Sequence, residues 1–204
     1  MAKRKFYWIL LGVVVILGMV FGMSGCTPSE PKSTDESTKQ EDTQTQESDT
    51  TPTNKIFNFY NAVNLDQTKE EVAKNLGVTP EINSNGSEYF KDEATGYGVM
   101  VGYDENGKVI TKGLIPPEKA AELLAMNPTP VTSEQVASIT PGMTYAEVTK
   151  IMGSDGVEVV YGINSVDKTS QISGVAWFNP DLSTAIVYLN GPKGTVLNAE
   201  FSAV

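Results

Sequence analysis

The sequence contains a single thiol. Cys26 is the one cysteine among 204 residues, and there is no histidine. Without histidine the chain has no Ser–His or Cys–His nucleophile, no imidazole metal ligand and no histidine pH switch. With one cysteine it also has no intrachain disulfide. The chemistry expected at Cys26 must therefore follow from the residues around it in the sequence.

Cys26 stands at the end of a pattern typical of export signals. Basic residues at 3–5 precede an uncharged apolar run at 6–23, and Ser24-Gly25 leads directly into the cysteine. A basic start, an apolar stretch and small residues before a cleavage point describe a secretory signal. The pattern predicts that residues 1–25 are a signal peptide.

Residues 23–26, Met-Ser-Gly-Cys, resemble the lipobox of bacterial lipoproteins, which usually reads Leu-(Ala/Ser/Thr)-(Gly/Ala)-Cys. The resemblance implies that the Cys26 thiol receives a diacylglyceryl group. The alternative is a transmembrane anchor, because eighteen apolar residues reach the lower limit of a membrane-spanning helix. Both interpretations keep the basic residues inside and the rest of the chain outside. We therefore expect lipid anchoring through Cys26 on the extracytoplasmic face of the bacterial cell membrane.

The chain beyond the signal is strongly acidic. Residues 1–25 hold three of the fifteen Lys and Arg and no acid, so twelve basic and twenty-five acidic side chains remain, a formal charge of −13. This charge disfavours nucleic acid and anionic headgroups as electrostatic partners. Residues 27–54 contain no aromatic side chain and, apart from proline, no aliphatic one. Region 26–54 is therefore expected to be a disordered, Ser/Thr-rich tether.

Two units of similar pattern follow, at 55–127 and 128–204. Residues 68–77 (TKEEVAKNLG) align with 144–153 (TYAEVTKIMG) at an offset of 76 positions. In both segments, a Thr with a Glu three residues later predicts a capping box. The closing Gly predicts the left-handed residue that ends the helix. The aligned segments therefore predict one short helix in each unit.

The remaining elements follow from apolar spacing and turn residues. A further helix is expected ahead of each aligned segment, at 56–63 and from Thr132 or Ser133, and a connecting helix at 116–126. Strands are expected at 89–91, 97–103, 108–114, 157–161, 174–178, 185–189 and 195–201. We therefore predict an α+β fold of two tandem units, each a helical hairpin packed on an antiparallel sheet of three or four strands.

Residues 139–144 (ITPGMT), continuing to Val148 and Met152-Gly153, resemble the signature of the β-lactamase-inhibitor-like superfamily. That superfamily includes the secreted tandem-repeat β-lactamase inhibitor proteins and the small BamE (SmpA/OmlA) outer-membrane lipoproteins. The resemblance implies a helical hairpin on an antiparallel sheet and, in the tandem inhibitors, a concave sheet surface that grips a protein. Asp66-Gln67 stands in the first unit where the second has Gly142-Met143, and the disulfides of the secreted inhibitors are absent. No partner-binding residue is carried over, because those residues lie outside the matched motif.

Aromatic side chains in the expected strands are the candidate contacts with a partner. Tyr and Trp are favoured anchors at protein interfaces. Successive strand residues point to opposite faces of the sheet, one of which must cover the helices. The sequence does not show which face is which, so each of these residues could equally be core. The candidates are Tyr97, Tyr103, Tyr161, Trp177 and Tyr188.

We interpret the chain as a membrane-anchored lipoprotein whose module binds a protein or an envelope component, with no catalytic residue, cofactor or metal. Asp104, Glu105 and Asn106 fit a hairpin turn and lack the ligand spacing of a calcium loop. Two alternatives remain. One is a cell-wall hydrolase with two carboxyl groups about 5 to 10 Å apart. The other is a BamE-like envelope assembly factor, which requires an outer membrane.

The lipid anchor is tested by replacing the thiol. We expect Cys26→Ser to release the protein from the membrane fraction or to leave it unprocessed, because a hydroxyl does not accept the diacylglyceryl group. Metabolic labelling with a radioactive fatty acid, followed by membrane fractionation, measures the outcome. Acyl label that persists in the variant would refute lipidation at this residue.

Overall fold

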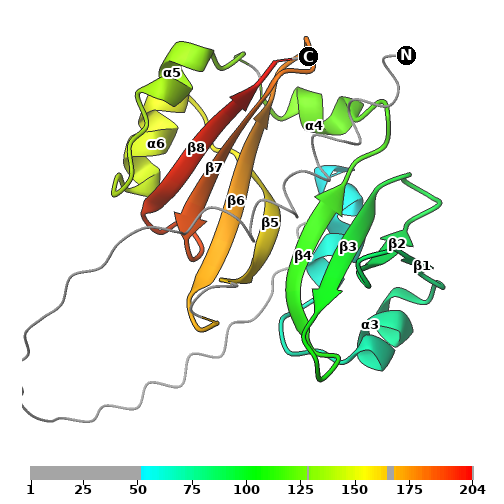
Figure 1. Ribbon diagram of the computed structural model, residues 1–204. Helices are drawn as coiled ribbons and strands as arrows, with labels where there is room; N and C mark the ends of the chain where they lie inside the picture. Colours follow the sequence, from blue (N-terminus) through cyan, green and yellow to red (C-terminus); the bar gives the residue numbers. More distant parts are fainter. Residues whose placement is uncertain (1–51, 128, 165–167, 204) are drawn as a thin grey trace, which may run out of the picture.

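The computed structural model describes residues 52–127, 129–164 and 168–203, which form an α+β fold (Figure 1). Cys26, the predicted signal peptide at 1–25 and most of the predicted tether at 26–54 lie outside these residues. The helical elements are η2 (Pro52–Phe57), α2 (Asn58–Ala62), α3 (Lys69–Leu76), α4 (Ala121–Ala125), α5 (Ser133–Ala137) and α6 (Tyr145–Met152). Among the described residues, no helix has the length and apolar content needed to cross a membrane.

Eight antiparallel strands form one sheet in chain order. All seven predicted strands are present, and a two-residue strand, β1, was not predicted. The sheet continues across the boundary predicted between the two units, where β4 and β5 pair through Thr111–Gly162, Lys112–Tyr161 and Gly113–Val160. The strands are β1 (Glu81–Ile82), β2 (Glu88–Lys91), β3 (Gly98–Tyr103), β4 (Val109–Ile115), β5 (Val157–Ile163), β6 (Gln171–Phe178), β7 (Thr184–Asn190) and β8 (Val196–Ser202).

The predicted helix boundaries of α3 and α6 are confirmed. The hydroxyl oxygens of Thr68 and Thr144 accept from the third helical amides, and Glu71 and Glu147 accept in return from the amides of the two threonines. Gly77 and Gly153 end the helices with φ of +67° and +79°. A third capping box, on Thr132, opens α5 at the predicted place.

The residues before α3 and α6 share one backbone arrangement although their sequences differ. Asp66 and Gly142 both have positive φ, at +67° and +91°. The amide of Asp66 donates to the oxygen of Val109 at 3.0 Å, and the amide of Gly142 donates to the oxygen of Val196 at 2.9 Å. Asp is one of the few L-residues that adopt this left-handed conformation readily, so it substitutes for glycine here.

The helices α2, α3, α5 and α6 pack on one face of the sheet, which we call the helix-covered face. Directly opposed residues of an antiparallel pair lie on the same face. The register therefore places Val101, Lys112, Tyr161, Ser173 and Leu189 on this face, in one row across the sheet. Figure 1 shows α2 behind β3 and β4, and α5 and α6 beside β8.

Two apolar cores result. In the first, Tyr60 and Val72 from the helices pack with strand residues such as Phe90 and Val99. In the second, Val148 and Met152 from α6 pack with Trp177 and further residues of β6 and β7. Each capped helix thus buries its apolar stripe against its own part of the sheet.

The capping box gives a stability prediction. We expect Thr144→Ala to lower the free energy of unfolding by about 1 kcal/mol, because the cap of α6 is lost. Thr149→Ala, inside the same helix, is the control and should lose less, since alanine favours a helix interior. Urea denaturation measures both. Equal stability of the Thr144 variant and the wild type would contradict this boundary.

Candidate functional site

A buried lysine lies where the two halves of the sheet meet. Lys112 on β4 is 9 % exposed. Its Nζ donates to the main-chain oxygens of Tyr60, at 2.9 Å, and Val63, at 2.8 Å. The same Nζ lies 4.3 Å from the centre of the Tyr60 ring. Burial lowers the pKa of Lys112, and the negative charge of Glu158 offsets part of that shift.

Tyr60 connects the lysine to a carboxylate on the next strand. Its hydroxyl donates to Oε1 of Glu158 on β5 at 2.9 Å. Burial raises the pKa of the Glu158 carboxyl, and the hydrogen bond from Tyr60 and the charge of Lys112 only partly oppose this. Burial, followed by the charge of Glu158, also raises the pKa of Tyr60. These three side chains therefore form a polar cluster between α2, β4 and β5.

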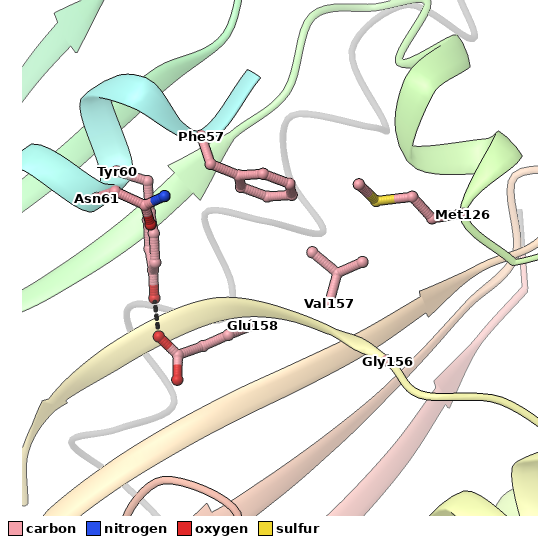
Figure 2. Close-up of a pocket in the computed structure, with 7 residues that line it drawn as sticks. All are labelled: Phe57, Tyr60, Asn61, Met126, Gly156, Val157 and Glu158. Atoms are coloured by element: carbon pink, nitrogen blue, oxygen red, sulfur yellow. Dashed lines mark hydrogen bonds between the residues drawn. The ribbon is translucent and has the colours of Figure 1, made fainter. Parts of the chain in front are cut away.

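A cavity of about 330 Å³ adjoins this cluster (Figure 2). Its lining comes from both halves of the chain, and among the described residues that line it Glu158 is the charged one. Figure 2 shows the side chains of Phe57, Met126 and Val157 converging from three different segments. The described lining residues are Phe57, Tyr60, Asn61, Met126, Gly156, Val157 and Glu158.

The second face of the sheet, which we call the opposite face, carries a tyrosine without a hydrogen-bond partner. The register places Tyr188 beside Gly174 and Asn198, and Ile186 beside Ala176 and Glu200. Tyr188 is 7 % exposed, and among the described residues its hydroxyl is the buried side-chain polar atom that lacks a partner. Burial raises the pKa of Tyr188, and the charge of Glu200 adds to this shift. Such an atom calls for an explanation, because buried polar groups are normally bonded.

The structure does not gather the five predicted aromatic residues on one face. Tyr97 is 1 % exposed and donates to Oε2 of Glu122 at 3.1 Å. Trp177 is also 1 % exposed, packs in the second core and donates to the oxygen of Ser154 at 3.1 Å. These two side chains are core in this structure, one of the two roles that the sequence left open.

Tyr103 and Tyr161 are half-buried on the side of the helices. The hydroxyl of Tyr103 donates to Oε2 of Glu88 at 2.7 Å, and Lys69 Nζ lies 4.7 Å from its ring centre. Tyr161 is directly opposite Lys112 on the helix-covered face. Tyr188 is therefore the one candidate of the five that the register assigns to the opposite face, and it is also a buried member of the first apolar core.

Sequence reasoning missed Lys112, Tyr60 and Glu158 as a cluster. Charged residues in strands are usually solvent-facing, so neither charge was singled out. The spacing of these residues within their predicted elements was the signal that could have identified them. Lys112 and Leu114 are two residues apart in the predicted strand, so they share a face. Tyr60 has the helical spacing with Ile56 and Val63 that indicates one apolar face.

The described part of the chain shows no metal site. No group of three or more His, Cys, Asp or Glu side chains in it is arranged to bind an ion. The cavity is likewise lined by one carboxyl group, that of Glu158. The described residues of the cluster and the cavity can interact with a ligand through hydrogen bonds, charge and apolar contact.

Comparison with known proteins gives one match. Residues 57–173 match the family model described as Beta-lactamase inhibitor (BLIP), which is more than half of the chain. No curated protein matches the sequence. The match begins at Phe57, the first residue of the cavity lining, and ends at Ser173 in β6.

The cluster predicts a pH-dependent stability difference. The folded state holds a proton on Glu158 more tightly than the unfolded state, whose value is near 4.5. The cost of the buried charge is therefore present above the raised pKa and disappears as the pH falls through it. We expect the wild type to gain stability relative to Glu158→Gln as the pH is lowered from about 8 to about 4. Glu105→Gln, in an exposed turn, is the control. Denaturation curves that keep a constant difference across this range would contradict the assignment.

Proposed function

The chain belongs to the beta-lactamase inhibitor (BLIP) family, and on this basis we propose that it is a non-catalytic module that binds a protein on the opposite face of its sheet. The observation that carries the proposal is the buried Tyr188 hydroxyl without a partner. A partner that offers an acceptor there would satisfy this group. The aromatic ring of Tyr188 is also a favoured anchor in protein interfaces.

The residues around Tyr188 suit a protein interface. Ile186 and Phe178 are apolar, buried members of the first core, whereas Asn198 and Glu200 on the last strand of the sheet are half-buried and polar. An apolar centre with a polar rim is the usual composition of such an interface. The strands that carry these residues are held rigid by the second core on their other side.

We also propose that the module consists of two duplicated units. Support comes from the paired details around α3 and α6. Both helices have a Thr–Glu capping box and a left-handed terminal glycine. Before each helix, a loop residue with positive φ donates its amide to the carbonyl oxygen of a strand residue. The amide of that strand residue donates in return to the oxygen of the following loop residue: Val109 to Gln67 at 2.9 Å, and Val196 to Met143 at 2.8 Å.

Membrane attachment completes the proposal. Lipidation of Cys26 would hold the module on the extracytoplasmic face of the membrane, with residues 27–54 as the spacer. The acyl chains would contribute roughly 0.8 kcal/mol per buried methylene, and two or more chains give stable anchoring. In this proposal the protein partner is a component of the envelope or a protein that reaches the cell from outside.

A β-lactamase is the first partner to test, because the family model is named for inhibitors of that enzyme. The hydrolase alternative needs two carboxyl groups that face each other across a cleft at about 5 to 10 Å. The described cavity contributes one, on Glu158, and that carboxylate already accepts from Tyr60. These observations favour binding over catalysis.

The proposal is tested on the full lipidated protein by crosslinking in its own envelope, affinity capture and identification of the captured proteins, with purified β-lactamases assayed directly. We expect Tyr188→Phe to weaken binding of the captured partner roughly three- to tenfold, because one hydrogen bond is lost. Glu200→Arg, on the same face, should weaken it further by reversing a charge at the rim.

Two variants on the other side of the sheet serve as matched controls. Tyr161→Phe removes a hydroxyl on the helix-covered face, and Glu134→Arg reverses an exposed charge on α5. Both should bind the partner as the wild type does. Unchanged binding by Tyr188→Phe and Glu200→Arg would overturn the location of the interface. The absence of any reproducible partner, together with turnover of a wall polysaccharide, would overturn the binding function.

A further inference from the structure

The cavity next to Tyr60 has the composition of a small-molecule site. Its volume of about 330 Å³ lies within the range of such sites, roughly 300 to 1,000 Å³. Its wall includes residues from both faces of the sheet. Glu158 is directly opposite Val175 on the helix-covered face, whereas Val157 is directly opposite Ala176, which pairs with Ile186 on the opposite face. Variants of Glu158 test the cavity, and variants of Tyr188 test the protein interface.

One end of the cavity is negatively charged and only partly satisfied. Among the described residues, Tyr60 is the one hydrogen-bond donor to the Glu158 carboxylate, and it contacts Oε1. Lys112 directs its protons to the oxygens of Tyr60 and Val63 and forms no ion pair with Glu158 within the described part of the chain. The Glu158 carboxylate, which lines the cavity, can therefore accept a further hydrogen bond from a ligand.

The rest of the lining is apolar and aromatic. Phe57, Met126 and Val157 converge on the cavity in Figure 2, and the ring of Tyr60 forms the wall next to Glu158. Aromatic rings attract cations through their faces, and thioethers and aliphatic groups accept an apolar stem. Among the described residues, no Lys or Arg lines the cavity. The chain is also acidic overall, with a net charge of −10, which favours the approach of cations.

We propose that this cavity binds a small organic cation that carries an ammonium group on a short apolar stem. The ammonium group donates to the Glu158 carboxylate beside the Tyr60 ring, and the stem lies against Phe57, Met126 and Val157. A free alkylamine and the lysine side chain of a peptide share this chemistry. The complementarity of charge and apolar surface is what distinguishes this ligand from a neutral or anionic one.

The test titrates the full chain with n-hexylammonium chloride, with n-hexanol as the neutral counterpart and Nα-acetyl-lysine methylamide as the peptide form. Isothermal titration calorimetry gives the affinity, and the ¹³C methyl signals of Val157 report whether the ligand enters this cavity. We expect saturable binding of hexylammonium, at least about tenfold weaker binding of hexanol, and weaker binding at acidic pH as Glu158 is protonated. The ratio of hexylammonium to lysine-amide affinity shows whether a free amine or a peptide side chain is the better ligand.

Two variants test separately the charge of Glu158 and the volume of the cavity. Glu158→Gln keeps the acceptor for Tyr60 but removes the charge, so it should weaken hexylammonium about tenfold and leave hexanol unchanged. Met126→Trp should fill the cavity and weaken both compounds, which tests the site even if the first variant folds poorly. Glu105→Gln, in an exposed turn, should bind as the wild type does. Equal affinity for hexylammonium and hexanol, or no saturable shift at Val157, would overturn the proposal.

Discussion

The position of one buried amino group constrains how the two halves of the sheet meet. Lys112 lies in the middle of the three residue pairs that join β4 to β5. It also donates to two carbonyl oxygens at the end of α2, where the negative end of the helix dipole favours a cation. A desolvated ammonium group is costly unless its protons are bonded. The end of α2, strand β4 and the pairing of β4 with β5 must therefore form together, because otherwise the ammonium group of Lys112 loses its hydrogen-bond acceptors.

The rest of the site follows from this constraint. With Lys112 against its ring, Tyr60 is held where its hydroxyl reaches Glu158 on β5. The helices of the first half thereby contact a strand of the second half. The cavity lies where Phe57, Met126 and Val157 line the remaining space beside this contact. Its described lining comes from both the first and the second half of the sheet and the segments next to them, so neither half alone forms it.

Local chemistry was predictable from the sequence, whereas long-range placement was not. The capping threonines and terminal glycines defined α3 and α6, because both signals act within a few residues. Strand β1 was missed because its two exposed residues, Glu81 and Ile82, pair only with β2. The face of each aromatic residue was also undetermined, because β6 and β7 are apolar on both faces and alternation alone does not identify the helix side. The hydroxyl of Tyr97 donates to Glu122 on α4, and the hydroxyl of Tyr103 donates to Glu88 on β2. These long-range partners fix the direction of both side chains.

The family match and the unpaired tyrosine support the binding function independently of each other. The matched residues, 57–173, contain the described residues that line the cavity but end before β7. Tyr188, Asn198 and Glu200 lie beyond the matched residues, and the register of β7 and β8 places them side by side. A buried hydroxyl without a partner costs about 1 to 3 kcal/mol. A protein partner that supplies the missing acceptor removes this cost on binding, so the group that destabilises the free module contributes affinity in the complex.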